Sequence, residues 1–404
     1  MKRSLQPQGG AAGPIFTASS VALIAATYGL ARLGYGLFLP AFSAAFALTP
    51  AIGGLLASGA SVTYCISAVL GFRHAPTHPR MVAVLAGMTA TGGSAGIAAA
   101  PGTTSFVGAV LLAGMGAGFS SPALVELVQR NFKPAERDML QSVVNSGTGF
   151  GVMAAGTFSL VLGSSWRLAW ALIAVISFSA MMGVLRADTS RGGSAQGLGP
   201  GSRRPPVPGT RHRRAGLRPL RRPITAAVIL GIGSSAIWVH GRTLLEGEGG
   251  MAVETSAAAW IALGAGGAAA ALTSPWLARH AIRTTWPVTV LAVALATGMF
   301  GIAPHSTLLS FGAAALFGLA YTAATSVLII WAARTAESNA AGTSVLFISL
   351  VLGQALGATL VGALIGTLEP GPAFIVAAII CGLSALGSPS PATSPRQVPS
   401  PVPQ

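Results

Sequence analysis

The sequence is poor in charge and in cysteine. Only 8% of its 404 residues are charged, whereas 52% are hydrophobic. Roughly a quarter of the residues in an ordinary soluble protein are charged, so this chain cannot cover itself with a solvated surface, and a soluble class is excluded. The two cysteines, Cys65 and Cys381, lie in separate apolar runs, which excludes a disulfide framework and a CxxC metal site.

Acids and histidines are scarce inside the apolar runs, which contain no aspartate, one glutamate (Glu126) and one histidine (His240). A membrane-embedded enzyme needs paired carboxylates, a metal cluster or an activated nucleophile. We therefore expect no enzymatic activity, no catalytic residue, no metal site and no cofactor.

What the sequence does contain is a series of long apolar runs. A bilayer core of roughly 30 Å is crossed by about 20 apolar residues of helix, whereas a barrel strand shows about 10 residues in alternation. The runs therefore predict an all-α polytopic membrane protein with twelve transmembrane helices. The expected spans are 20–43, 51–72, 80–100, 105–127, 140–162, 167–186, 224–245, 256–278, 286–303, 307–332, 341–366 and 371–387.

The basic residues are distributed unevenly between the two sides of these spans. With the N-terminus inside the cell, 21 of the 24 Lys and Arg residues fall on the cytoplasmic side, and only Arg167 falls outside. This is the positive-inside pattern of a membrane protein, and it accounts for the net charge of +15 without a nucleic-acid partner. We expect a multi-pass protein of the cell (inner or plasma) membrane with both termini in the cytoplasm.

The spans divide into two sets of six around a basic linker. We expect a disordered tail at 1–16, a six-helix bundle at 17–186, a linker at 187–223, a second bundle at 224–387 and a disordered Pro/Ser-rich tail at 388–404. The arginines of the linker should lie against anionic lipid headgroups. A nucleic-acid-binding arm is the alternative, but a linker between two bundles needs no such function.

Corresponding residues recur in the two sets at a spacing of about 204. The pairs are Gly114 and Gly318, Arg130 and Arg334, Gly149 and Gly353, and Trp170 and Phe374. The tripeptide RHA at 73–75 recurs at 279–281, in the loop after the second helix of each set. The pattern indicates a duplicated six-helix unit, as in transporters built from structural repeats.

Over residues of about 17 to 388, the chain resembles the major facilitator superfamily. The stretch GMGAGFSSPALVELVQRNFKPAERD (114–138) is similar to the fourth helix of that family and its cytoplasmic exit. NSGTGFGVMAAG (145–156) is similar to the glycine-rich fifth helix, and WRLAW (166–170) to the start of the sixth.

Three features depart from the family pattern. The loop after the second helix reads GFRHAPTHPR where the family has GxLADRxGRR, so its acid is missing. The second copy, SPWLARHAIR, lacks an acid as well, and the fourth helix has no arginine in the stretch 106–112.

The resemblance implies a secondary active transporter that moves a small organic solute by rocker-switch alternating access. It also implies a monomer in the bilayer, with protons as candidate co-substrates. A non-transporting membrane receptor or scaffold with the same fold is the alternative, and it is distinguished by the absence of saturable uptake.

The first substrate-binding candidate is Arg32, about 12 residues into the first span. A charge near the bilayer midplane costs at least about 2.5 kcal/mol, so it must face a cavity or a partner. Tyr28 and Tyr35, at i−4 and i+3, share its helix face. The arginine either bonds carbonyl groups of a neighbouring helix or binds an anionic substrate.

The other candidates are polar residues at middle depth in later spans. Asn145, Tyr321 and Gln354 are expected to line the cavity. His240 is either a packed neutral histidine or part of a proton relay. We expect Arg242, two residues further on, to extend toward the acids of the external stretch 246–254.

Candidate gating residues gather at the cytoplasmic ends. Glu126 and Arg130 are spaced i,i+4 and are expected to pair. Alternatively, Glu126 supplies the acid missing from the loop, so that Arg73 or Arg80 binds it when the inner gate closes. The repeat adds the arginines of the second half, Arg279, Arg283 and Arg334.

Overall fold

The computed structural model describes residues 12–163, 165–189, 218–336 and 339–389, and these residues form helices joined by short turns. The first helix has three consecutive parts, of which the middle one is π-helical: α1 (Ala12–Ile24), η1 (Ala25–Leu33) and α2 (Gly34–Phe46). Five helices follow, namely α3 (Pro50–His74), α4 (Pro79–Ala99), α5 (Thr103–Asn131), α6 (Pro134–Leu162) and α7 (Trp166–Ala187).

The second half repeats this order. Its first helix is again divided by a π-helical segment: η2 (Arg218–Leu220), α8 (Arg221–Ser235), η3 (Ala236–His240) and α9 (Gly241–Glu246). The next is α10 (Val253–Ala269), η4 (Ala270–Thr273) and α11 (Ser274–Arg279). Four more follow, namely α12 (Ile282–Ile302), α13 (Thr307–Thr335), α14 (Asn339–Thr367) and α15 (Pro370–Leu383) with η5 (Ser384–Gly387).

The predicted polytopic fold is confirmed. Within the described residues, eleven helical segments are long and apolar enough to cross a membrane. The remaining long helix, α6, is less apolar because its middle reads NSGTGFG. Proline begins α3, α4, α6 and α15, where its missing N–H costs no helical hydrogen bond, so the sequence itself separates the helices.

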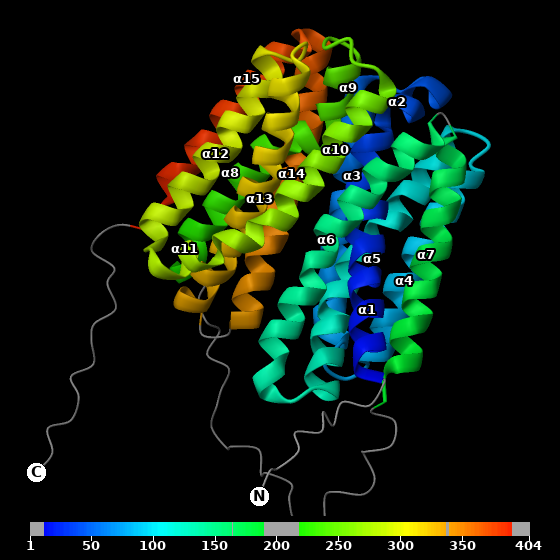
Figure 1. Ribbon diagram of the computed structural model, residues 1–404, viewed down its shortest axis with the longest axis vertical. Helices are drawn as coiled ribbons and strands as arrows, with labels where there is room; N and C mark the ends of the chain where they lie inside the picture. Colours follow the sequence, from blue (N-terminus) through cyan, green and yellow to red (C-terminus); the bar gives the residue numbers. More distant parts are fainter. Residues whose placement is uncertain (1–11, 164, 190–217, 337–338, 390–404) are drawn as a thin grey trace, which may run out of the picture.

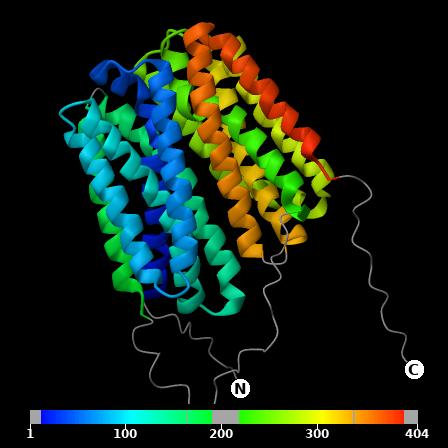
Figure 2. The ribbon, with the colours of Figure 1, turned by 180° about the vertical axis from the view of Figure 1, so that it is seen from behind.

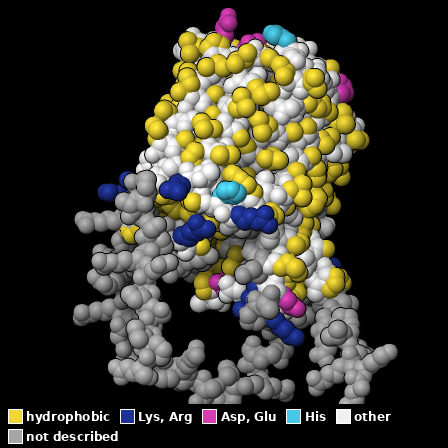
Figure 3. Space-filling view, turned by 60° about the vertical axis from the view of Figure 1, so that its left-hand side comes forward, with side chains coloured by type: hydrophobic (Ala, Val, Ile, Leu, Met, Phe, Trp, Pro, Cys, Tyr) yellow, Lys and Arg dark blue, Asp and Glu magenta, His cyan; other side chains and the backbone are white. Residues whose placement is uncertain are grey.

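The helices form two groups, α1–α7 and α8–η5, which we call the first and second halves (Figures 1 and 2). They meet mainly where α3 packs on α14 and where α6 packs on α10. We call the end where α7 stops and α8 starts the linker end. Figure 3 shows apolar side chains on the flank of the molecule, Lys and Arg gathered toward the linker end, and acids at both ends.

The boundaries of the predicted domains are close to the helix ends but differ by a few residues. The first helix begins at Ala12, five residues before the expected 17, because the apolar residues of GPIF extend it. Asp188 belongs to the folded first half, and the second half starts at Arg218. Most of the linker (190–217) and most of both predicted tails (1–11 and 390–404) lie outside the described residues.

Glycines set the closest helix contacts within each half. A Cβ at Gly151 would overlap the carbonyl oxygen of Ala25, so α6 packs directly on η1. At the matching place in the second half, Gly353 packs on the backbone of Val228 in α8. Small residues allow this approach in lipid, where hydrophobic burial supplies no driving force between helices.

The π-helical segments η1 and η3 occupy equivalent places in the two halves. Each lies in the middle of the first helix of its half. The last turn of each contains a residue predicted from the sequence to have a function, Arg32 in η1 and His240 in η3. Short π-helical stretches often occur at functional sites, because they displace side chains from the regular helical register.

Candidate functional site

Arg32 lies between the two halves and contacts residues of both. One guanidinium nitrogen, Nη2, donates to Oε1 of Gln354 on α14 over 2.9 Å. The guanidinium also lies over the ring of Tyr64 on α3, 4.7 Å from its centroid. Another nitrogen of the same side chain, Nε, is buried and has no hydrogen-bond partner among the described residues.

The four tyrosines of the chain gather around this arginine. Tyr28 and Tyr64 share a hydrogen bond of 2.9 Å between their hydroxyl groups. The hydroxyl of Tyr35 donates to the carbonyl of Gly53. Tyr321 accepts a hydrogen bond of 2.8 Å from Nε2 of Gln354, which connects it to Arg32 through one amide.

A cavity of about 40 Å³ lies against Arg32 between the halves. Tyr35, Ser61, Ser235, Trp238 and Gln354 contribute to its lining. This volume holds water molecules but no organic solute. A solute that reaches Arg32 must therefore displace side chains such as the amide of Gln354.

The charge of Arg32 is not balanced by any acid that lines this cavity within the described residues. Its polar and aromatic neighbours, Gln354 and Tyr64, are neutral. Among the described residues of this lining, Arg32 therefore carries an uncompensated positive charge.

The structure brings together only some of the predicted substrate-binding residues. Arg32, Tyr35 and Gln354 line the cavity, and Tyr321 contacts Gln354. Tyr28 lies one contact further away, where it binds Tyr64 and Ser121.

Two of the predicted residues lie elsewhere. Asn145 is exposed on α6 and accepts a hydrogen bond from Gln141. His240 is 1% exposed and lies outside the cavity lining, near the place where Gly54 of α3 meets Ala358 of α14. Tyr64 and Trp238 are not among the residues predicted from the sequence, although the scarcity of tyrosine in the chain was a usable signal for Tyr64.

The halves are in contact at the end opposite the linker. Gly36 of α2 approaches the carbonyl of Trp238 so closely that a Cβ would overlap it, and Gly54 approaches the carbonyl of Ala358 in the same way. In the part of the chain that the structure describes, the hydrogen bonds between halves lie at the level of Arg32 and Tyr64 or nearer this end. We call this contact region the opposite-end closure.

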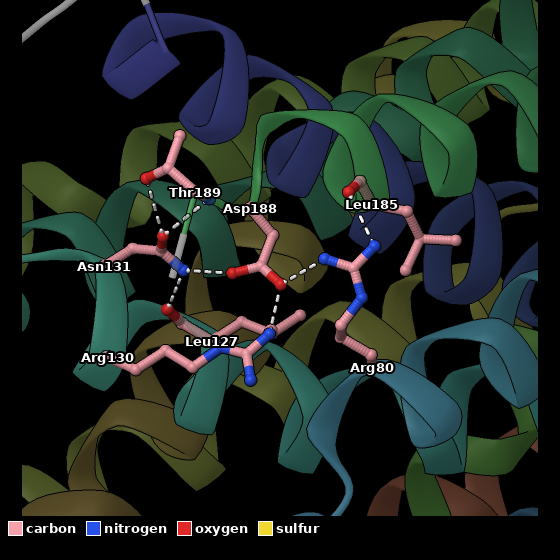
Figure 4. A network of polar contacts seen from close by, with 7 residues as sticks. All are labelled: Arg80, Leu127, Arg130, Asn131, Leu185, Asp188 and Thr189. Carbon is pink, nitrogen blue, oxygen red and sulfur yellow. Dashed lines mark hydrogen bonds and ion pairs between the residues drawn. The ribbon is translucent and has the colours of Figure 1, made fainter. Parts of the chain in front are cut away.

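At the linker end, Asp188 joins three helices of the first half (Figure 4). Its carboxylate pairs with Arg80 at the start of α4, over 2.6 Å, and with Arg130 near the end of α5. Asn131 donates to the other carboxylate oxygen over 2.9 Å. The side chain of Asp188 is 1% exposed, so these contacts fix the end of α7 against α4 and α5.

The expected pair of Glu126 with Arg130 is wrong, because Arg130 reaches Asp188 instead. Among the described residues Glu126 has no ion pair, and Arg80 also turns to Asp188. Asp188 falls within the range predicted as the linker, 187–223, and is therefore not among the predicted site residues. The other gating candidates are exposed at the linker end, namely Arg73, Arg279, Arg283 and Arg334.

We expect the substitution Asp188→Asn to destabilise the protein by about 1–3 kcal/mol, because two arginines lose a charged acceptor. Thermal unfolding of purified protein in detergent measures the change. Glu126→Gln is the matched control, since it removes an acid near the same end of α5 without breaking an ion pair, and its unfolding temperature should stay unchanged. Equal unfolding temperatures for Asp188→Asn and the parent protein would contradict the prediction.

Arg242 is also placed differently from the expectation. It does pair with one of the acids of the external stretch, Glu246, over 2.5 Å. However, it does not extend into water, because its side chain is only 4% exposed. It lies within the opposite-end closure, where it donates to residues of the first half.

Comparisons with known proteins agree with this architecture. Residues 21–358 match the family model of the Major Facilitator Superfamily, whereas no curated protein matches the chain. A D-xylose-proton symporter structure is similar at a TM-score of 0.70 and 12% identity, over 92% of this chain and 96% of that chain.

Two further solved structures show the same similarity. A peptide transporter POT structure matches at a TM-score of 0.72 and 13% identity, over 92% of this chain and 92% of that chain. A nucleoside transporter NupG structure matches at 0.67 and 13% identity, over 92% and 97%. At these identities the similarity shows a shared fold.

Proposed function

The chain belongs to the Major Facilitator Superfamily, and from this premise we propose that it is a secondary transporter of a small organic anion that carries one carboxylate. In this proposal the two halves tilt about Arg32, so that the cavity opens alternately at the linker end and at the opposite end. The protein lies in the cell membrane, with the linker end and both termini in the cytoplasm.

The observation that carries the proposal is the unbalanced charge of Arg32. A guanidinium between the halves, bonded to a neutral amide and stacked on a neutral ring, gains most from a carboxylate, which it can bind through two parallel hydrogen bonds. A second carboxylate on the same solute would find no second cation in the cavity lining formed by the described residues. We therefore propose selection for a monoanion over a dianion.

The remaining parts of the proposal concern partners and gating. The protein acts as a monomer, its basic linker end contacts anionic lipid headgroups, and a proton is the candidate co-substrate, with His240 as the group to test. Arg73, Arg80, Glu126, Arg130, Arg279, Arg283 and Arg334 remain candidates for contacts that close the linker end. Asn145 remains a candidate for substrate contact in a differently tilted state.

Uptake into proteoliposomes tests the proposed function. The solutes are radiolabelled benzoate and lactate as monocarboxylates, succinate as a dicarboxylate, choline as a permanent cation and xylose as a neutral solute. We expect saturable uptake and counterflow for at least one monocarboxylate, and at least about 10-fold slower uptake of succinate, because its second charge is unpaired. Transport of choline or xylose alone would contradict the proposed substrate class, and no saturable uptake of any solute would favour the receptor or scaffold alternative.

A further inference from the structure

Arg242 lies near the start of α9, inside the opposite-end closure, and its hydrogen bonds divide between the two halves. Within the second half, Nε donates to Glu246 over 2.5 Å and to Ser256 over 2.9 Å, and Nη2 donates to the carbonyl of Val253 over 3.1 Å. Nη1 donates to the first half only. Its acceptors are the carbonyl of Leu37 on α2 and the hydroxyl of Ser159 on α6, both at 2.7 Å.

The two sets of bonds differ in their dependence on the tilt of the halves. Glu246, Ser256 and Val253 move together with Arg242, so these bonds persist in every tilted state. The bonds to Leu37 and Ser159 exist only while this end is closed. An interaction shifts a conformational equilibrium only if it differs between the two states, and these two bonds meet that condition.

The sequence around the acceptors supports the arrangement. Pro40 lies inside α2, where its missing N–H leaves the carbonyl oxygen of Gly36 without a helical donor, in the same turn as Leu37. Ser159 is 2% exposed, and its hydroxyl bonds Arg242 across the interface of the halves. Both acceptors are neutral, so Glu246 keeps its role as the counter-ion of Arg242 in either state.

We propose that Arg242 is a clamp between the halves: Glu246 and Ser256 hold its guanidinium in place, and its bonds to Leu37 and Ser159 stabilise the state that is closed at the end opposite the linker. The clamp acts on the equilibrium between the two conformations, so its effect does not depend on which solute is transported. When it opens, Nη1 must exchange two buried acceptors for water, which lowers the population of the state open at this end.

The two serines bonded to Arg242 provide a matched test. Ser159→Ala removes an acceptor of the first half, whereas Ser256→Ala removes a partner within the second half. Both are examined in a background in which Cys65 and Cys381 are replaced by alanine and a reporter cysteine replaces Ala57. Ala57 is 8% exposed and lines the cavity beyond the closure.

A membrane-impermeant maleimide is added to intact cells, and the labelling rate of the reporter is measured. We expect Ser159→Ala to raise the rate about 5- to 10-fold, because one charged hydrogen bond of the closed state is lost. Ser256→Ala should lower the unfolding temperature of the purified protein but leave the labelling rate within about 2-fold of the parent. A cysteine that replaces His305, an exposed residue in the turn between α12 and α13, serves as a control for the side of the membrane that the reagent reaches. It should label equally in all variants.

A second variant covers the case in which Ser159→Ala does not fold. Arg242→Lys retains the charge beside Glu246, but its single ammonium group cannot reach both halves, so it should raise the labelling rate as well. The clamp is disproved if folded Ser159→Ala or Arg242→Lys protein labels at the parental rate, or if Ser256→Ala raises the rate as much as Ser159→Ala does.

Discussion

Replacing Arg32 with glutamine is expected to lower carboxylate uptake by at least about 100-fold, because among the described residues the guanidinium is the only cation in the lining of the central cavity. Two charged hydrogen bonds to a bound carboxylate would be lost, and together they exceed the roughly 2.7 kcal/mol that corresponds to this factor. Insertion and stability should hold, since glutamine is neutral and the substitution removes a charge that is costly at this depth. Proteoliposome uptake at a series of benzoate or lactate concentrations measures the change in kcat/KM.

Two further variants separate charge from geometry. Arg32→Lys keeps the positive charge but loses the planar pair of donors, so we expect an intermediate loss of about 10-fold. Gln354→Glu places a carboxylate at the position of Oε1, which lies 2.9 Å from Nη2 of Arg32. This internal partner should compete with the substrate and suppress uptake as strongly as Arg32→Gln does. Normal uptake by either folded Arg32→Gln or folded Gln354→Glu protein would contradict the assignment of the site.

The sequence pointed, one residue at a time, to several of the side chains that the structure places at the central cavity. A guanidinium at middle depth in a span costs free energy in the bilayer, whichever way it faces. No other span contains an acid at that depth, so Arg32 could be identified from the sequence alone. Tyr35 was predicted from its position on the same helix face as Arg32, and Gln354 from its polarity and depth. Tyr64 could have been included, because tyrosine is rare in this chain.

The contacts between helices could not be predicted in the same way. Arg130 has an acid four residues before it, and helical spacing alone favours Glu126 as its partner. The structure places α7 so that Asp188, 58 residues further along the chain, binds Arg130 instead. Likewise, Arg242 has Glu246 as a local partner, but its bonds to Leu37 and Ser159 depend on how the two halves pack. Local periodicity fixes which residues share a helix face, whereas the neighbour of that face is set by tertiary packing.

Replacing Gly36 with alanine is expected to prevent closure at the end opposite the linker. A Cβ at this position would overlap the carbonyl oxygen of Trp238, which belongs to the other half. The obstacle is backbone, so no side-chain rotation can relieve it. The state that is open at this end separates the two segments and tolerates the methyl group. The variant should therefore accumulate in that state, and uptake should fall by at least about 100-fold, because alternating access requires both states.

Gly151→Ala is the matched control for this prediction. Its Cβ would overlap the carbonyl oxygen of Ala25, which belongs to the same half and stays in contact however the halves tilt. We expect it to lower the unfolding temperature without changing the conformational equilibrium. The labelling rate of a cysteine at position 57 from outside the cell distinguishes the two outcomes, since it should rise in Gly36→Ala and remain unchanged in folded Gly151→Ala.

A parental labelling rate in folded Gly36→Ala protein would mean that the halves can close without this contact. In that case the backbone of Trp238 would have to shift. Its ring, which packs edge-on against Tyr321 with 5.5 Å between the ring centroids, would move as well. Because Tyr321 holds the amide of Gln354, such a shift would reach the acceptor of Arg32. Gly36→Ala protein that labels at the parental rate should then bind carboxylates with altered affinity, so either outcome connects the opposite-end closure to the central site by a measurable change.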